Sequence, residues 1–148
     1  MRVYLAGKMQ GRSGLEVIEE RARASNACRV YGVEYFDPAE NEDVPTDGSL
    51  IDLKTDFVTM KNYVAKDFAA VTTCDVLLVL TGDIPSDGTL WEMGWAHSRN
   101  IPVVLVAPKR CSGELMSFSS ILADAMFPTV EEAVKFIDQN YRPVGEQV

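Results

Sequence analysis

Glu92 is the first residue in this sequence whose position suggests chemistry. It lies near the start of a predicted helix, after the loop that follows an apolar segment typical of a buried strand. A carboxylate there can attack a sugar carbon and form a glycosyl-enzyme intermediate, which splits one difficult displacement into two easier ones. A structural alternative exists, because Thr89-Leu90-Trp91-Glu92 also fits a capping box that closes the first turn of a helix.

Asp67 is the second candidate, because the pattern places its carboxylate beside an apolar stripe. It follows Met60 by seven residues and Val64 by three, and it precedes Val71 by four. Burying an unpaired charge is costly, so such a side chain is either hydrogen-bonded into the structure or lines a cavity where it acts. The pattern alone supports both interpretations equally.

The segment from Gly7 to Gly14 could bind a phosphate, because its glycines let backbone amides approach an anion and Lys8 and Arg12 add positive charge. It matches neither the P-loop nor the dinucleotide-binding fingerprint. An ordinary turn between a strand and a helix, with solvated basic residues, is the alternative. His97 lies inside a predicted helix and is better explained as a packed or surface histidine than as a base.

Apolar segments and helical periodicity alternate along the chain. Strands are predicted at 3–6, 33–36, 76–80, 101–106 and 125–127. Helices are predicted at 15–26, 53–73, 89–98, 115–123 and 130–140. This alternation predicts a parallel sheet with right-handed crossovers that place helices on both faces. The ligand site of such a sheet lies beyond the carboxyl ends of the strands, where the segments 7–14 and 82–88 and the turn after Phe36 should converge.

Two further expectations follow from the same pattern. The helix at 53–73 should turn one apolar face toward the core, because Phe57, Met60, Val64, Phe68 and Val71 follow the helical period. The stretch 39–49, rich in Asn, Asp, Pro and Gly, should be a loop long enough to have a working role, such as a substrate lid.

Composition bounds the class of protein. At 148 residues, with 47% apolar and 24% charged residues, the chain is expected to form one domain, 1–148. A formal net charge of −8 would repel a polyphosphate, so no nucleic acid polymer is expected as a partner. No apolar run approaches the length of a membrane span, so no membrane is expected either. The start lacks the features of a signal peptide, which predicts a cytoplasmic protein. Cys28, Cys74 and Cys111 are scattered singly and are expected to be buried thiols, with no zinc site.

Several segments, taken in order, resemble the nucleoside 2-deoxyribosyltransferase family over nearly the whole chain. The most specific is Asp87-Gly88-Thr89-Leu90-Trp91-Glu92-Met93-Gly94-Trp95-Ala96. The others are Tyr4-Leu5-Ala6-Gly7, Phe36-Asp37-Pro38-Ala39-Glu40-Asn41, Lys66-Asp67-Phe68, Cys74-Asp75-Val76 and Glu114-Leu115-Met116.

The resemblance implies a role for each matching residue. Glu92 would be the nucleophile that attacks the anomeric carbon, and Tyr4 would orient its carboxylate. Asp67 would exchange a proton with the departing and incoming nucleobase, which makes a poor leaving group tolerable. The substrate would also be bound by residues of three loops, namely Gly7, Lys8, Gly11, Arg12, Ser86, Asp87, Gly88, Glu114 and Met116. No metal or organic cofactor is implied, because side chains fill every role.

Two positions depart from the family pattern. Ser86 stands where transferases usually have an aspartate that contacts the 5′-hydroxyl of the sugar, and Asp87 follows one place later. Serine at that place resembles the related nucleoside 5′-monophosphate N-glycosidases, and Gly11-Arg12 fits a phosphate as well. Glu114 points the other way, because it replaces an asparagine or serine that would reach a neighbour's site, and a carboxylate there would repel a phosphate.

We therefore expect a flavodoxin-like doubly wound α/β sandwich, with a mainly parallel five-stranded sheet. The expected activity is transfer of deoxyribose from a 2-deoxynucleoside to another nucleobase through a covalent intermediate on Glu92. The alternatives are an N-glycosidase that hydrolyses a 2-deoxynucleoside 5′-monophosphate, and a catalytically silent nucleotide-binding protein. The resemblance also implies a homo-oligomer with shared active sites, in which residues 114–118 lie near the junction. The preferred base, the tolerance of ribose and the oligomer size stay open.

Overall fold

The computed structural model describes residues 1–84, 86–113 and 122–146. At its centre is a parallel sheet whose strands lie in the order β2-β1-β3-β4-β5. The strands are β1 (Arg2–Ala6), β2 (Glu34–Phe36), β3 (Val76–Val79), β4 (Val103–Val106) and β5 (Ala125–Phe127). This is the strand order of flavodoxin-like folds, so the predicted fold class is confirmed.

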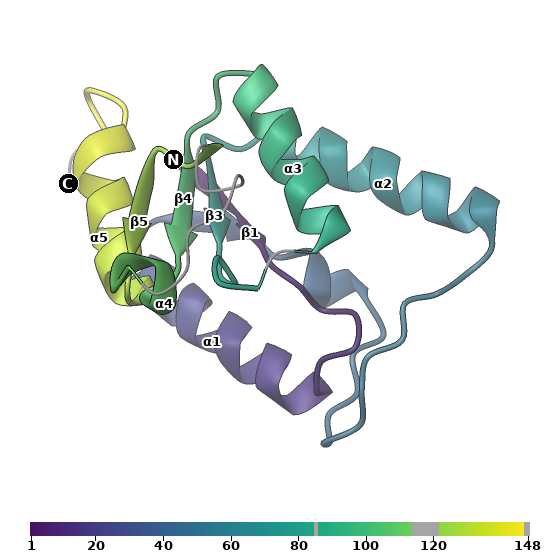
Figure 1. Cartoon of the computed structure of the whole chain (residues 1–148). Helices are drawn as coiled ribbons and strands as arrows, with labels where there is room; N and C mark the ends of the chain where they lie inside the picture. The colour runs from purple at the N-terminus through teal and green to yellow at the C-terminus, as the bar shows by residue number, and fades with distance from the viewer. Residues whose placement is uncertain (85, 114–121, 147–148) are drawn as a thin grey trace.

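Helices cover both faces of the sheet (Figure 1). α1 (Gly14–Val30) and α5 (Val130–Tyr141) pack on one face, and α2 (Phe57–Thr72) and α3 (Asp87–Ser98) lie on the other. Two short elements, the 3-10 helix η1 (Pro38–Asn41) and α4 (Pro108–Cys111), follow β2 and β4. None of the helices in the described part of the chain is long and apolar enough to cross a membrane.

The alternation of side chains along β1 assigns its residues to the two faces. Val3 and Leu5 belong to the core shared with α1 and α5, whereas Tyr4 and Ala6 belong to the core shared with α2 and α3. All four are buried because β1 lies inside the sheet, between β2 and β3. Tyr4 therefore points to the same side of the sheet as α3, which carries Glu92.

The chain leaves β1 toward β2 on one side and later returns to β3 on the other, so the strand order reverses between β1 and β3. Ala6 is paired with Val79 at the carboxyl ends of these strands. Open α/β sheets bind their ligands in the crevice outside such a switch point. The loops after β1 and β3 are tied together there, because Lys8 donates its backbone N–H to Thr81 Oγ1 at 2.9 Å.

The boundaries of several helices differ from the predicted ones. α1 extends to Val30, and α2 begins at Phe57, four residues later than predicted, because Asp56 caps it by accepting a hydrogen bond from Thr59 N at 2.9 Å. α3 begins at Asp87, two residues earlier than predicted. Most of the helix predicted at 115–123 lies outside the described residues. Of the cysteines, Cys28 and Cys74 are buried, whereas Cys111 is exposed, contrary to prediction.

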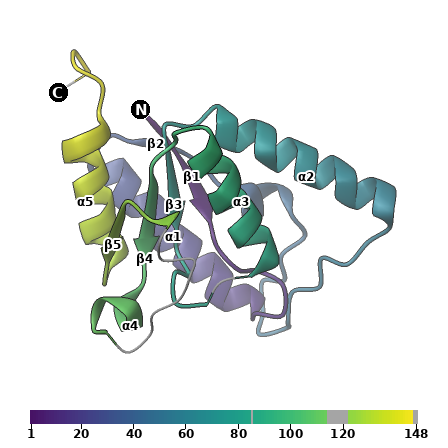
Figure 2. The same ribbon diagram turned by 45° about the horizontal axis from the view of Figure 1, so that its top comes forward.

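The prediction that the apolar face of α2 packs inward is wrong. Only Val71, near its carboxyl end, is buried, whereas Phe57 is 76% exposed, Val58 67% and Val64 44%. Figures 1 and 2 show the reason, because α2 runs away from the sheet and only its last turns lie near β3 and α3. Most of the predicted apolar stripe is therefore exposed.

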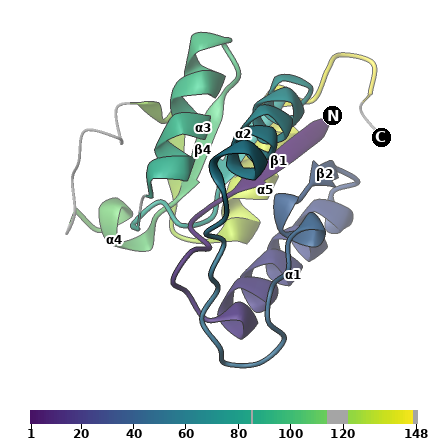
Figure 3. The same cartoon turned by 90° about the vertical axis from the view of Figure 1, so that its right-hand side faces the viewer.

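The segment after η1 packs against the loop between β1 and α1 (Figure 3). Gly11 N–H donates to Ile51 O at 2.9 Å and Ile51 N–H to Arg12 O at 2.8 Å. Gly14 N–H donates to Ser49 O at 2.9 Å, and a Cβ on Gly14 would lie only 2.0 Å from Pro45 O. The composition of 39–49 suggested a substrate lid. The hydrogen bonds and the close approach of Gly14 to Pro45 instead attach this segment to the loop between β1 and α1.

Candidate active site

Glu92 lies in the second turn of α3, with the end of its side chain buried. The helix is capped by Ser86, whose Oγ accepts a hydrogen bond from Thr89 N at 3.4 Å, so Thr89 is not the N-cap. The capping-box interpretation of Glu92 is therefore wrong. Its Oε2 has no hydrogen-bond partner among the described residues. Buried polar atoms are nearly always paired, and an unpaired one in a native structure is a mark of a functional group.

Tyr4 is fully buried on the same side of the sheet. Its ring stacks on Phe36 with 5.5 Å between centroids, which fixes the direction of the phenol. The Oη atom also lacks a hydrogen bond of standard geometry within the described ranges. It nevertheless lies close enough to Glu92 for each group to shift the pKa of the other. The two groups thus face each other, and a hydrogen bond between them contributes to the pKa shift of both.

Asp67 is half-buried on α2, and an aromatic contact between the two helices sets its place. The neighbouring Phe68 stacks on Trp95 of α3 with 5.0 Å between centroids and 9° between ring planes. Trp95 Nε1 also donates to Thr72 Oγ1 at 2.9 Å, and the Arg99 guanidinium lies 4.2 Å from the centre of the indole ring. This packing holds the helix that carries Asp67 against the helix that carries Glu92.

The electrostatics of the three groups show that they share one site. Burial raises the pKa of Glu92 to about 7, and the negative charge of Asp67 adds to this, while Tyr4 and Arg21 act in the opposite direction. Burial also raises the pKa of Asp67 to about 6, with a contribution from Glu42 and an opposing one from Lys66. The pKa of Tyr4 is raised by burial and then by Glu92 and Asp67.

This arrangement suits nucleophilic and acid–base chemistry near neutral pH. Two carboxyl groups whose pKa values lie close to 7 and 6 can exist as one carboxylate and one carboxylic acid at the same time. The carboxylate can act as a nucleophile and the acid can donate a proton. The structure therefore brings Tyr4, Asp67 and Glu92 together, as the sequence analysis expected.

The loop between β1 and α1 has little room for a phosphate. Arg12 donates to both carboxylate oxygens of Glu20, at 3.0 and 3.1 Å, and to Lys8 O at 3.0 Å. The backbone amides of Lys8, Gly11, Arg12, Gly14 and Leu15 all donate to protein oxygens. Amides and a guanidinium engaged in this way are not free to bind an anion. Gly11 is in the left-handed region with φ +77°, which glycine tolerates.

The remaining candidates lie at the start of α3 or outside the described residues. Ser86 Oγ lies 3.0 Å from Thr89 Oγ1, so its hydroxyl is engaged within the helix start. Asp87 and Gly88 are exposed in the first turn of α3. Glu114 and Met116 lie outside the described residues.

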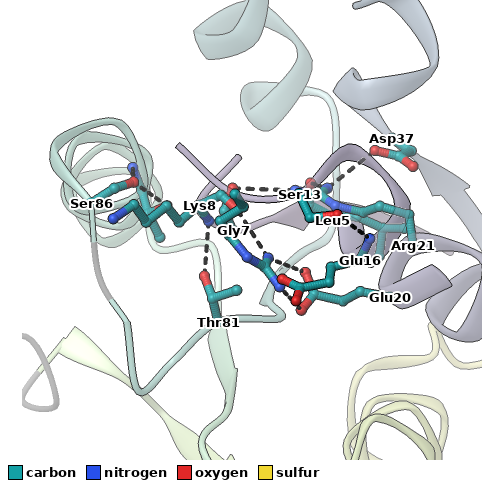
Figure 4. Close-up of polar contacts among 12 residues, drawn as sticks. Leu5, Gly7, Lys8, Ser13, Glu16, Glu20, Arg21, Asp37, Thr81 and Ser86 are labelled. Atoms are coloured by element: carbon teal, nitrogen blue, oxygen red, sulfur yellow. Dashed lines mark hydrogen bonds and ion pairs between the residues drawn. The ribbon is translucent and has the colours of Figure 1, made fainter. Parts of the chain in front are cut away.

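Sequence reasoning missed a buried ion pair behind the site. Arg21 of α1 and Asp37, which follows β2, are 4% and 6% exposed and lie 3.1 Å apart (Figure 4). The signal was present, because Arg21 lies four residues after the apolar Val17 and three before Ala24, on the face that meets the sheet. Glu42 was also missed, although its charge acts on Asp67.

Comparison with known proteins gives consistent results. The family model described as nucleoside 2-deoxyribosyltransferase matches residues 3–126. A solved 2-deoxyribosyltransferase of Bacillus psychrosaccharolyticus aligns with a TM-score of 0.68 and 22% identity, covering 96% of this chain and 93% of that one. A conserved protein of Enterococcus faecalis aligns with a TM-score of 0.65 and 16% identity, covering 94% and 98%.

A third solved structure is the CMP N-glycosidase of Clostridium botulinum. It aligns with a TM-score of 0.54 and 14% identity, covering 93% of this chain and 99% of that one. At these identities the structural likenesses establish the fold. A search of curated proteins finds no significant match.

The raised pKa of Glu92 predicts a stability cost that depends on pH. Because the pKa lies near 7 in the folded protein, against an ordinary value of 4.5, the folded state binds the proton more tightly than the unfolded chain. The contribution of Glu92 to the free energy of unfolding is fully present below pH 4.5 and is lost as the pH rises through 7. We expect Glu92→Gln to raise the free energy of unfolding at pH 8.5 by about 1 to 3 kcal/mol, with no gain at pH 4.

Urea denaturation at several pH values measures this difference. Glu19→Gln is the matched control, because it removes the same charge from an exposed position on α1. Equal effects of the two substitutions across the pH range would show that burial of Glu92 does not carry the effect.

Proposed function

Because the chain belongs to the nucleoside 2-deoxyribosyltransferase family, whose members are enzymes that act on N-glycosidic bonds, we propose that it cleaves a 2-deoxynucleoside and transfers the sugar to another nucleobase. The observation that carries this proposal is the buried, unpaired Glu92 carboxyl beside Tyr4 and Asp67 at the switch point of the sheet. These three residues are the proposed catalytic groups.

In the first half-reaction, the Glu92 carboxylate attacks the anomeric carbon of the deoxyribose. The electron pair of the bond between this carbon and the base nitrogen moves onto the base as the bond breaks. The carboxylic acid form of Asp67 donates a proton to the base. Because the pKa of Glu92 lies near 7 and that of Asp67 near 6, this step requires the proton that the two carboxyls share to move to Asp67 when the substrate binds. The products are a neutral base and a deoxyribosyl ester of Glu92.

In the second half-reaction, an acceptor base enters the space that the first base has left. The Asp67 carboxylate takes a proton from its attacking nitrogen, the nitrogen bonds to the anomeric carbon, and the Glu92 carboxylate departs. The Tyr4 hydroxyl donates a hydrogen bond to Glu92 and selects the oxygen that attacks. The effect of each group on the pKa of the other supports this role.

We favour a substrate with a free 5′-hydroxyl over one with a 5′-phosphate. The Arg12 guanidinium and the loop amides that a phosphate would need already bind protein oxygens. The proposed catalytic centre also holds two carboxyl groups, with Glu42 beside Asp67, so a dianion would add repulsion.

The second candidate function is hydrolysis of a 2-deoxynucleoside 5′-monophosphate. Ser86 in place of an aspartate favours it, and the fold is shared with a protein named as a CMP N-glycosidase. The two reactions differ in whether a base or a water molecule attacks the deoxyribosyl intermediate, and exclusion of water from the site decides between them.

We also propose that the working enzyme is a homo-oligomer in which a second copy covers the exposed apolar surface of α2 and α3. This surface comprises Phe57, Val58, Met60, Tyr63, Val64, Leu90 and Trp91. An adjoining apolar groove of about 520 Å³ is lined by Phe68, Leu90, Trp91, Gly94, Trp95 and Ser98. Exposed apolar surface of this kind marks interaction sites. Phe68 and Trp91 are sequence neighbours of Asp67 and Glu92, so a copy seated here would close the catalytic site.

Glu92→Gln is expected to reduce transfer by about three orders of magnitude or more, because the amide cannot form the ester intermediate. The assay incubates deoxyinosine with and without free adenine and identifies deoxyadenosine, hypoxanthine and free deoxyribose. Wild-type protein quenched during turnover should carry a deoxyribosyl adduct on Glu92 by mass spectrometry. Retention of most activity in the variant, with Glu19→Gln as surface control, would falsify covalent catalysis at this residue.

Deoxycytidine is expected to be turned over faster than dCMP at equal concentration and constant salt. Arg12→Ala should change the rate with dCMP little, because the guanidinium is already bound to Glu20. Glu20→Gln should shift the preference toward dCMP by releasing that guanidinium. A clear preference of the wild type for dCMP contradicts the nucleoside assignment and favours the hydrolase.

Val58→Asp is expected to dissociate the oligomer, because it places a charge in the exposed apolar surface at the start of α2. Sedimentation velocity measures the change. Val30→Asp is the matched control, since Val30 is 78% exposed at the end of α1, on the other side of the sheet, while Val58 is 67% exposed. A wild-type protein that sediments as a monomer, or equal dissociation by both substitutions, would refute this interface.

A further inference from the structure

Arg21 makes hydrogen bonds that tie three chain segments together behind the site. Its Nη1 donates to Leu5 O at 2.6 Å and to Asp37 Oδ1 at 3.1 Å, and its Nη2 donates to Gly7 O at 3.2 Å. Figure 4 shows the guanidinium between the end of β1 and Asp37. Leu5 lies in β1, and Gly7 is the first residue after this strand, at the switch point.

Asp37 is held as firmly as its partner. Its Oδ1 also accepts a hydrogen bond from Ala39 N at 2.9 Å, and the residue is the N-cap of η1. The side chains of Arg21 and Asp37 are 5% and 6% exposed, so solvent screens the pair little. The guanidinium therefore has a defined position relative to the carboxyl ends of both β1 and β2.

Stability alone is a poor explanation for such a pair. Removing two charges from water costs several kcal/mol each, and well-packed apolar residues of similar volume often serve a core equally well or better. Val17 and Ala24 on the same face of α1 show what the core of this protein uses elsewhere. A buried pair that is retained at the edge of a candidate active site is better explained by its effect on that site.

We propose that Arg21 is a positioning residue for the reaction: held by Asp37, it fixes the end of β1 that carries Tyr4 and keeps a positive charge behind the Glu92 carboxylate. The inference rests on the proposed function, in which Glu92 must be ionised to attack. Arg21 acts from the α1 side of the sheet, and we assign it no contact with the substrate.

Several charged and polar groups act on Glu92 and on its neighbour Asp67. Tyr4 acts from β1 and Asp67 from α2, while Glu42 after η1 and Lys66 on α2 act on Asp67. Burial and the Asp67 charge both raise the pKa of Glu92, and Arg21 lowers it. Arg21 also lowers the pKa of Tyr4, so it opposes the build-up of negative charge on both groups. Without Arg21, less Glu92 would be ionised at neutral pH.

Three variants separate the charge of Arg21 from the integrity of the pair. Asp37→Asn keeps the cation and an acceptor oxygen for it. Arg21→Met with Asp37→Asn removes the cation without leaving a buried carboxylate unpaired, so it is the variant expected to fold. Arg21→Lys keeps the charge but loses the planar guanidinium, whose two Nη atoms donate to two backbone carbonyls and to the Asp37 carboxylate.

Carbon-13 NMR of glutamate-labelled protein follows the titration of the Glu92 carboxyl, which is assigned by its loss in Glu92→Gln. We expect the pKa of Glu92 in the double variant to exceed that in Asp37→Asn by about one unit, which means a tenfold smaller ionisation constant. Arg21→Lys should lie near the wild type. The same pKa in Asp37→Asn and in the double variant would overturn the proposal.

Kinetics provide the second measurement. In the double variant, the acidic limb of the pH profile of kcat/KM should move to higher pH by as much as the pKa of Glu92 rises in the NMR titration. In Arg21→Lys, the acidic limb should stay at the pH of the wild type. A uniform loss of rate with an unmoved limb would show a structural role and overturn the proposal. The NMR titration needs no turnover, so a wild type inactive on nucleosides would refute the proposed function while the titration still decides the effect of Arg21 on Glu92.

Discussion

Burial of a negative charge at Glu92 is the constraint on which the rest of this structure depends. A carboxylate in water is well solvated, and burying it on α3 takes that solvation away, while its Oε2 has no hydrogen-bond partner among the described residues. The second carboxyl, Asp67, makes the cost larger through repulsion. A fold that accepts this arrangement must hold the groups in place by other contacts, since the groups themselves favour separation.

Those contacts come from both faces of the sheet. On one face, the stack of Phe68 on Trp95 and the hydrogen bond from Trp95 to Thr72 keep α2 against α3 near their ends. On the other face, Arg21 donates to the carbonyls of Leu5 and Gly7 at the end of β1 and is held by Asp37. The aromatic contact resists the repulsion by packing, whereas the Arg21 charge lowers the pKa of Glu92.

Periodicity was enough to predict the sheet, the helices and the side of α2 on which Asp67 lies, because these depend on local patterns of apolar residues. The start of α3 was misplaced because Ser86 and Thr89 are both good N-cap residues, and only the tertiary position of the loop selects Ser86. The pair of Arg21 and Asp37 joins residues sixteen apart in sequence, and no local pattern reports such a contact. The period along α2 indicates an apolar stripe, but a periodic pattern does not tell whether that stripe packs on the sheet, and most of it does not.

The two unusual features of the described chain are connected through α2. Asp67 lies on a helix that buries only its last turns on the sheet, and the rest of that helix exposes Phe57, Val58 and Val64. The charge of Asp67 raises the pKa of Glu92, so the place of α2 beside α3 affects the protonation of the site. The stack of Phe68 on Trp95 fixes that place. In the proposed oligomer, the same helix would carry both the acid–base group and the interface.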